Sequence, residues 1–71
     1  METVVMDVPD ISCAHCARAI DEALEPVPGV GEVRVDVAGR TVTVAYDAAA
    51  VGVERIAEVL AEADYPVAGR R

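Results

Sequence analysis

The spacing of apolar residues constrains the fold of this 71-residue chain more than any other feature. Apolar and polar residues alternate in three short runs, at positions 4–8, 33–37 and 42–46. Alternation with a period of two is typical of half-buried strands. In two other segments, 16–27 and 53–63, the apolar residues recur at steps of three and four. That spacing predicts two amphipathic helices.

Turn residues separate these segments. Pro9 ends the first strand, because Pro donates no ladder hydrogen bond. The sequence Ala38-Gly39-Arg40 predicts a tight turn in which Gly39 takes a positive φ, so that the flanking strands form a hairpin. A short last strand is expected over Pro66–Ala68, at an edge of the sheet.

The predicted order is strand, helix, strand, strand, helix, strand. This order matches the α+β, ferredoxin-like βαββαβ arrangement, a four-stranded antiparallel sheet with both helices on one face. We expect a single domain over residues 1–71. A chain of this size buries only roughly 60% of the surface that its unfolded state exposes, so its core is thin. Any chemistry is therefore expected on a surface loop and not in a deep cleft.

Charge and hydropathy exclude several classes of function. The formal net charge is −7, and all six basic residues are Arg, so the chain repels nucleic acid phosphates. The longest apolar stretch, Ala48–Val51, is too short to span a bilayer, so no membrane insertion is expected. The start, Met1-Glu2-Thr3, lacks the basic and apolar parts of a secretory signal, which favours a cytoplasmic location. The acidity favours a partner with a basic docking patch.

The residues that carry chemistry are Cys13 and Cys16, separated by Ala14 and His15. The pair lies where the first loop meets the first helix, with Ser12 or Cys13 as the expected N-cap. Free backbone N–H groups and the helix dipole stabilise negative charge there, which favours the thiolate form. Soft thiolates select soft ions such as Cu(I), and two sulfurs can complete a Cu(I) site.

One C-x-x-C pair by itself allows three other interpretations. A structural zinc site needs four ligands, and this chain offers one cysteine pair and one His. A thioredoxin-like redox pair also stands at a helix start, but the chain is short for that fold and has no Trp. An inert structural pair would be buried in apolar surroundings, whereas this pair follows a polar loop.

Together these segments resemble the heavy-metal-associated domain family, and in particular its bacterial copper chaperones. The resemblance covers nearly the whole chain. It includes the C-x-x-C at the helix start, Val27-Pro28-Gly29-Val30, Tyr46-Asp47 and Tyr65. It implies the ferredoxin-like fold, Cu(I) as the cargo, and Cys13 and Cys16 as the metal ligands.

The segment before the first cysteine departs from the family pattern Gly-Met-Thr/Ser-Cys-x-x-Cys. Ser12 matches it, and Ile11 can fill the apolar slot of the usual Met. Asp10 replaces Gly and brings a hard oxygen near the sulfurs. The resemblance therefore leaves Zn(II) or Cd(II), with Asp10 as an added ligand, as the alternative cargo.

Two further residues are possible neighbours of the metal. His15 matches a position often occupied by His in bacterial copper chaperones. It either supports or bridges the metal ligands or tunes the charge of the thiolates, or it is a solvent-facing helix residue beside the site. Tyr65 matches an aromatic residue near the metal loop, and it either shields the site or only packs at its rim. Asp64 replaces the usual Gly before it and tolerates positive φ better than most residues.

The sequence thus predicts a cytoplasmic metallochaperone without catalytic residues. It is expected to pass Cu(I) by ligand exchange, through a three-sulfur intermediate, to a metal-transporting P-type ATPase or another C-x-x-C domain. It is expected to be monomeric without metal and able to form a metal-bridged homodimer. The alternatives are the Zn(II)/Cd(II)-binding domain, a thiol–disulfide redox protein, and a domain of a larger ATPase.

Overall fold

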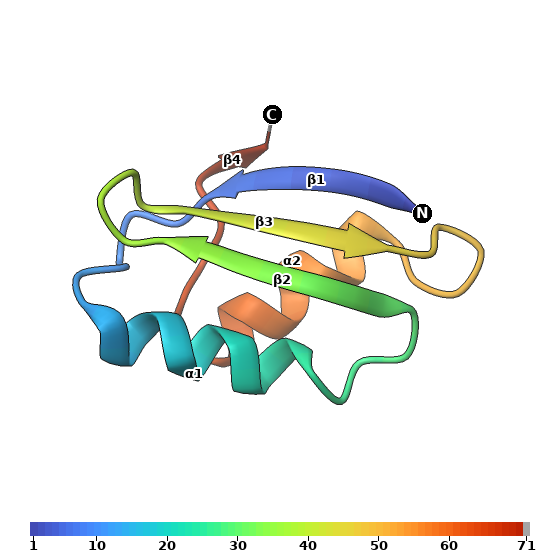
Figure 1. The fold of residues 1–71 in the computed structure, drawn as a ribbon, viewed down its shortest axis with the longest axis horizontal. Coiled ribbons are helices and arrows are strands. Elements are labelled where there is room, and N and C mark those ends of the chain that lie inside the picture. Colours follow the sequence, from blue (N-terminus) through green and yellow to red (C-terminus); the bar gives the residue numbers. More distant parts are fainter. Residues whose placement is uncertain (71) are drawn as a thin grey trace.

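The computed structural model describes residues 1–70 and follows the predicted order of elements (Figure 1). The four strands form one layer, and the two helices form a second layer packed on it. Their bounds are β1 (Glu2–Asp7), α1 (Ala14–Leu24), β2 (Val30–Asp36), β3 (Thr41–Tyr46), α2 (Val53–Glu62) and β4 (Gly69–Arg70).

The strands form one antiparallel sheet in the order β2-β3-β1-β4. Both helices cover the same face of this sheet (Figure 1). The register pairs Val4 with Val44 and Val35 with Val42, so the apolar residues of neighbouring strands share a face. The α+β, ferredoxin-like arrangement that periodicity predicted is confirmed.

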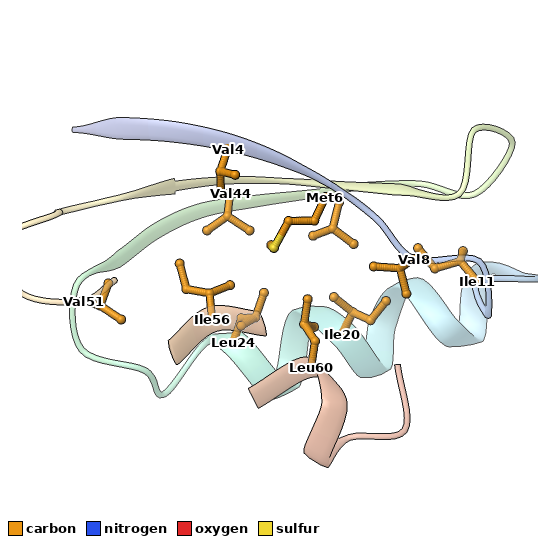
Figure 2. Packing of buried hydrophobic residues seen from close by; sticks show 11 residues of the cluster. Val4, Met6, Val8, Ile11, Ile20, Leu24, Val44, Val51, Ile56 and Leu60 are labelled. Atoms are coloured by element: carbon orange, nitrogen blue, oxygen red, sulfur yellow. The ribbon is translucent and has the colours of Figure 1, made fainter. Parts of the chain in front are cut away.

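The core lies between the sheet and the two helices (Figure 2). The strands contribute alternate residues, and each helix contributes residues four apart, as the two periodicities require. Burying these side chains is the main stabilising contribution to a domain of this size. The buried residues are Val4, Met6, Val8, Ile11, Ile20, Leu24, Val42, Val44, Val51, Ile56 and Leu60.

The last strand lies later than predicted. It is Gly69–Arg70 instead of Pro66–Ala68, although its edge position beside β1 is confirmed. Pro66 has no N–H, so the first ladder contact comes at Ala68, whose N–H donates to the Asp7 carbonyl at 2.8 Å.

The hairpin of β2 and β3 is confirmed, but its positive φ is not at Gly39. Arg40 has a φ of 54° instead. The Asp36 carboxylate accepts a hydrogen bond from the Gly39 N–H at 3.1 Å, and the last residue before β3 then reverses the chain. The Arg40 carbonyl accepts a hydrogen bond from the Val8 N–H at 2.9 Å, which joins this turn to the end of β1.

The helix α1 also ends earlier than its apolar pattern suggested. The pattern continues to Val27, but the helix stops at Leu24, two residues before Pro26. Val27 still packs against the core from the following turn. In the described part of the chain, neither helix has the length and hydropathy needed to cross a membrane.

Candidate metal site

The loop between β1 and α1 is held to the core by two apolar side chains. Val8 and Ile11 are both fully buried, and the Ile11 N–H donates to the Val8 carbonyl at 3.2 Å. The residues between them, Pro9 and Asp10, are therefore turned outward and exposed. This anchoring fixes where the chain enters α1.

The two cysteines stand at that entry. Cys13 is the N-cap residue of α1, with an extended backbone, and its carbonyl accepts hydrogen bonds from the N–H groups of Cys16 and Ala17. The Sγ atoms of Cys13 and Cys16 lie 3.9 Å apart, and both thiols are free. Cys13 is exposed, whereas Cys16 is half-buried and packs against the core. The sulfur of Cys13 is thus open to solvent, whereas Cys16 is held by its contacts with the core.

The surroundings of Cys16 favour its thiolate. Its pKa is lowered to about 6, first by a hydrogen bond from the Tyr65 side chain and then by hydrogen bonds from the backbone and hydroxyl of Ser12. Burial opposes this shift, and Cys13 adds to it. The Ser12 Oγ lies 3.6 Å from the Cys16 Sγ. At neutral pH this sulfur is therefore mostly a thiolate, the form that binds metal.

Tyr65 reaches the site from the other end of the sequence. It follows α2, is half-buried, and packs against the same core as Cys16. Its pKa is raised, chiefly by the hydrogen bond to Cys16. Tyr65 therefore reaches the same core as Cys16, and its role near the metal stays a prediction.

Asp10 and His15 are not brought into a ligand cluster with the cysteines. Both side chains are exposed. Within residues 1–70 no group of three or more His, Cys, Asp or Glu side chains is arranged to hold a metal ion. The arrangement therefore offers two sulfurs, supported by Ser12 and Tyr65.

The spacing of the sulfurs indicates what such a pair can do. With a metal–thiolate bond of about 2.3 Å, sulfurs 3.9 Å apart subtend an angle of roughly 115° at the metal. This angle is close to that of a three-coordinate site. Cys13 is the exposed sulfur of the pair, so a further thiolate would reach the site from its side.

The sequence analysis missed the role of Val8 in the site. Val8 was expected only as a core residue of the first strand, but its carbonyl also holds the Ile11 backbone. The available signal was an apolar residue directly before Pro9, at the point where the strand must end.

The chain is similar in sequence to several known proteins. The chain is 34% identical over 68 residues to the copper chaperone CopZ of Bacillus subtilis (strain 168), covering 96% of this chain and 99% of that protein. It is 32% identical over 65 residues to the periplasmic component of a mercuric transport protein of Pseudomonas aeruginosa, covering 92% and 71% of the two chains. A copper-exporting P-type ATPase of Bacillus subtilis (strain 168) is 36% identical over 64 residues, which are 90% of this chain but 8% of the ATPase.

The chain is also similar to a solved structure. Oxidized MerP from Ralstonia metallidurans CH34 superposes with a TM-score of 0.89 at 31% identity, covering 94% of this chain and 93% of that one. The family described as the heavy-metal-associated domain matches residues 5–66. This range includes both cysteines and Tyr65. The chain therefore belongs to the heavy-metal-associated domain family.

Proposed function

We propose that this protein is a cytoplasmic metallochaperone that binds Cu(I) between the thiolates of Cys13 and Cys16. The observation that carries the proposal is the pair of free thiols 3.9 Å apart at the start of α1. The lowered pKa of Cys16 supports it, because a metal ligand that is already a thiolate binds without first losing a proton.

The ligand set favours Cu(I) over Zn(II). Two thiolates form a soft donor pair, and structural Zn(II) sites are almost always four-coordinate. Asp10 is exposed and forms no three-ligand group with the cysteines in the described residues. The similarity to CopZ also supports copper. The similarity to a mercuric transport protein makes Hg(II), another soft ion, the second candidate cargo.

The site is suited to transfer by ligand exchange. Two thiolates and one Cu(I) carry one net negative charge, which the positive end of α1 stabilises. A partner thiolate can approach from the exposed side of Cys13 and bind the ion in a three-sulfur intermediate. The bonds to Cys13 and Cys16 then break in turn as the two thiolates of the partner replace them. No covalent bond of a substrate changes, so the protein is not an enzyme.

The expected partner carries its own C-x-x-C pair. The similarity to part of a copper-exporting P-type ATPase supports such a domain as the acceptor. The net charge of −7 favours an acceptor with basic residues around its cysteines, because complementary charge raises the rate of encounter. An exposed site also allows two copies to share one ion, so the proposal includes a metal-free monomer and a metal-bridged homodimer.

Anaerobic competition titrations of the reduced protein test the choice of ion. Cu(I), Zn(II) and Hg(II) are each titrated against a chelator, with Cys13→Ser as the loss-of-ligand control. The expected result is one tightly held Cu(I) per chain, weak Zn(II) binding, and loss of Cu(I) in the control. Tight Zn(II) binding that Asp10→Gly abolishes would replace the proposal by the Zn(II)/Cd(II) alternative.

A second measurement tests transfer and the redox alternative. Copper-loaded protein is mixed with metal-free protein that carries an isotope label in its amino acids, and the movement of copper to the labelled protein is followed in the presence of a chelator that traps released ion. Rapid exchange without trapped copper is expected. Insulin-reductase activity together with no tight binding of a soft ion would instead indicate a thiol–disulfide protein.

A further inference from the structure

The turn of the β2–β3 hairpin lies at the same end of the sheet as the loop that leads to the cysteines (Figure 1). The register places it there. Thr41, the first residue of β3, pairs both with Asp36 at the end of β2 and with Asp7 at the end of β1. The hairpin turn, residues 37–40, is therefore next to the metal loop, residues 8–13.

A chain of backbone hydrogen bonds connects the hairpin turn to the metal loop. The Val8 N–H donates to the Arg40 carbonyl at 2.9 Å, and the Ile11 N–H donates to the Val8 carbonyl at 3.2 Å. Pro9 has no N–H, so the residue after Val8 cannot extend the contact with the turn. Val8 therefore joins the turn to the segment that leads into Cys13.

Burial makes this connection hard to break. Val8 and Ile11 are both fully buried (Figure 2). A buried N–H that loses its acceptor costs about as much as a lost hydrogen bond, so such groups are nearly always paired. If the Arg40 carbonyl moved, the end of β1 would have to move with it or leave the Val8 N–H unpaired. A change in the turn is thus passed on to Ile11 and to Cys13, which follows it closely in the chain.

Two residues outside the metal loop set the conformation of the turn. Arg40 has a φ of 54°, in the left-handed region that disfavours residues with a Cβ. Rotation about this bond would turn the Arg40 carbonyl away from Val8. The Asp36 carboxylate accepts a hydrogen bond from the Gly39 N–H at 3.1 Å, which holds the residue before Arg40. Both side chains are exposed, so neither contributes to the core.

We infer that Asp36 and Arg40 are positioning residues for the metal site, because they shape the turn whose carbonyl holds the base of the metal loop. A loosened loop lets Cys13 leave its place 3.9 Å from Cys16. Binding must then restore that order, which lowers the affinity for the ion. The effect on Cu(I) rests on the proposed function, whereas the link between turn and loop does not.

Two pairs of substitutions test this role with charge held equal. Arg40→Asn tolerates positive φ, whereas the β-branched Arg40→Val resists it. Asp36→Asn keeps an oxygen acceptor for the Gly39 N–H, whereas Asp36→Ala removes it. Arg40→Val and Asp36→Ala are the disrupting variants, and the two Asn substitutions are the conserving variants. If Arg40→Val does not fold, the Asp36 pair carries the test.

Amide hydrogen exchange of the metal-free protein, followed by NMR, is the first measurement. The readout is the exchange rate of Val8 and Ile11 relative to that of Val44 in the central strand β3. Local opening changes this ratio, whereas a global loss of stability does not. The disrupting variants should raise it roughly fivefold, the effect of one neutral hydrogen bond on an equilibrium constant. The conserving variants should keep the wild-type ratio.

Competition for Cu(I) against a chelator is the second measurement, at a temperature where every variant is folded. Gly29→Ala is the stability control, because Gly29 precedes β2 at the opposite end of the sheet, where Val30 pairs with Tyr46. The disrupting variants should bind Cu(I) roughly fivefold more weakly than the wild type. Gly29→Ala and the conserving variants should bind it as the wild type does.

The inference is overturned if the disrupting variants keep the wild-type exchange ratio, or if the conserving variants change it to the same extent. It is also overturned if Gly29→Ala weakens Cu(I) binding as much as the disrupting variants do. If the wild-type protein fails to bind Cu(I) but the exchange ratios follow the expected pattern, the proposed function fails and the link between turn and loop stands.

Discussion

Ile11 links the stability of the core to the geometry of the metal loop, so its truncation should affect both. Its side chain is fully buried beneath the loop that leads to Cys13 (Figure 2). Ile11→Ala removes three carbons, worth about 0.8 kcal/mol each in transfer free energy. A residual cavity adds to this, so we expect a total loss of about 3 kcal/mol, within the usual range of roughly 2–5 kcal/mol.

That loss is large for this chain. A 71-residue domain has a free energy of unfolding of roughly 4–11 kcal/mol at about 0.05–0.15 kcal/mol per residue. Each 1 kcal/mol shifts the melting temperature of a domain of this size by roughly 4–8 °C, so Ile11→Ala should melt roughly 12–24 °C lower. Thermal unfolding of the metal-free protein, followed by circular dichroism, measures this shift.

Ile56→Ala is the matched control. Ile56 has the same side chain, is also fully buried, and lies on α2 instead of on the metal loop. Both variants should lose similar stability. Only Ile11→Ala should also weaken Cu(I) binding in a chelator competition at a temperature where both are folded, because only Ile11 supports the segment next to Cys13. Equal Cu(I) affinities for the two variants would refute this reasoning.

Three further predictions concern the backbone and the thiolate. Gly29→Ala should cost about 2–4 kcal/mol in chemical denaturation, because φ is 93° and an added Cβ would lie 2.8 Å from the Ala50 Cβ. Arg40→Gly should raise the melting temperature by several degrees. The left-handed φ of 54° costs a residue with a Cβ about 1 kcal/mol, and Gly removes this cost. The metal-free protein should gain stability as pH rises from about 6 to about 9, because the folded pKa of Cys16 is about 6 against a usual value of 9.0. That contribution is complete above the unfolded pKa and is lost as pH falls through the folded one. Tyr65→Phe should raise the folded pKa of Cys16, so the gain in stability should begin at a pH above about 6. Denaturation at several pH values would measure this change.

Each of these has a defined contrary result. A Gly29→Ala protein as stable as the wild type would mean that Ala50 and its neighbours can move aside. An Arg40→Gly protein that melts lower would mean that the arginine side chain itself stabilises the hairpin. A pH profile unchanged by Tyr65→Phe would show that Ser12 and Cys13 are enough to lower the pKa of Cys16.

Local patterns were sufficient for most of the fold and for the cysteine pair. The alternation through Val4 and Met6 depends only on the pleat of a strand, and the spacing of Ile20 and Leu24 depends only on the pitch of a helix. The neighbouring residues likewise limit the N-cap of α1 to Ser12 or Cys13, and the structure has it at Cys13. Such features need no knowledge of what the segment packs against.

The tertiary structure decided the features that depend on distant partners. Tyr65 could shield the metal loop or merely pack at its rim. It follows α2 whereas Cys16 lies in α1, and both pack against one core that the helices and the sheet form together. The shift of β4 to Gly69–Arg70 depends on where β1 offers a free edge. The positive φ falls on Arg40 and not on Gly39 because the pairing of β2 with β3 sets the length of the loop. In each case the deciding contact joins residues from different elements, and no local preference specifies it.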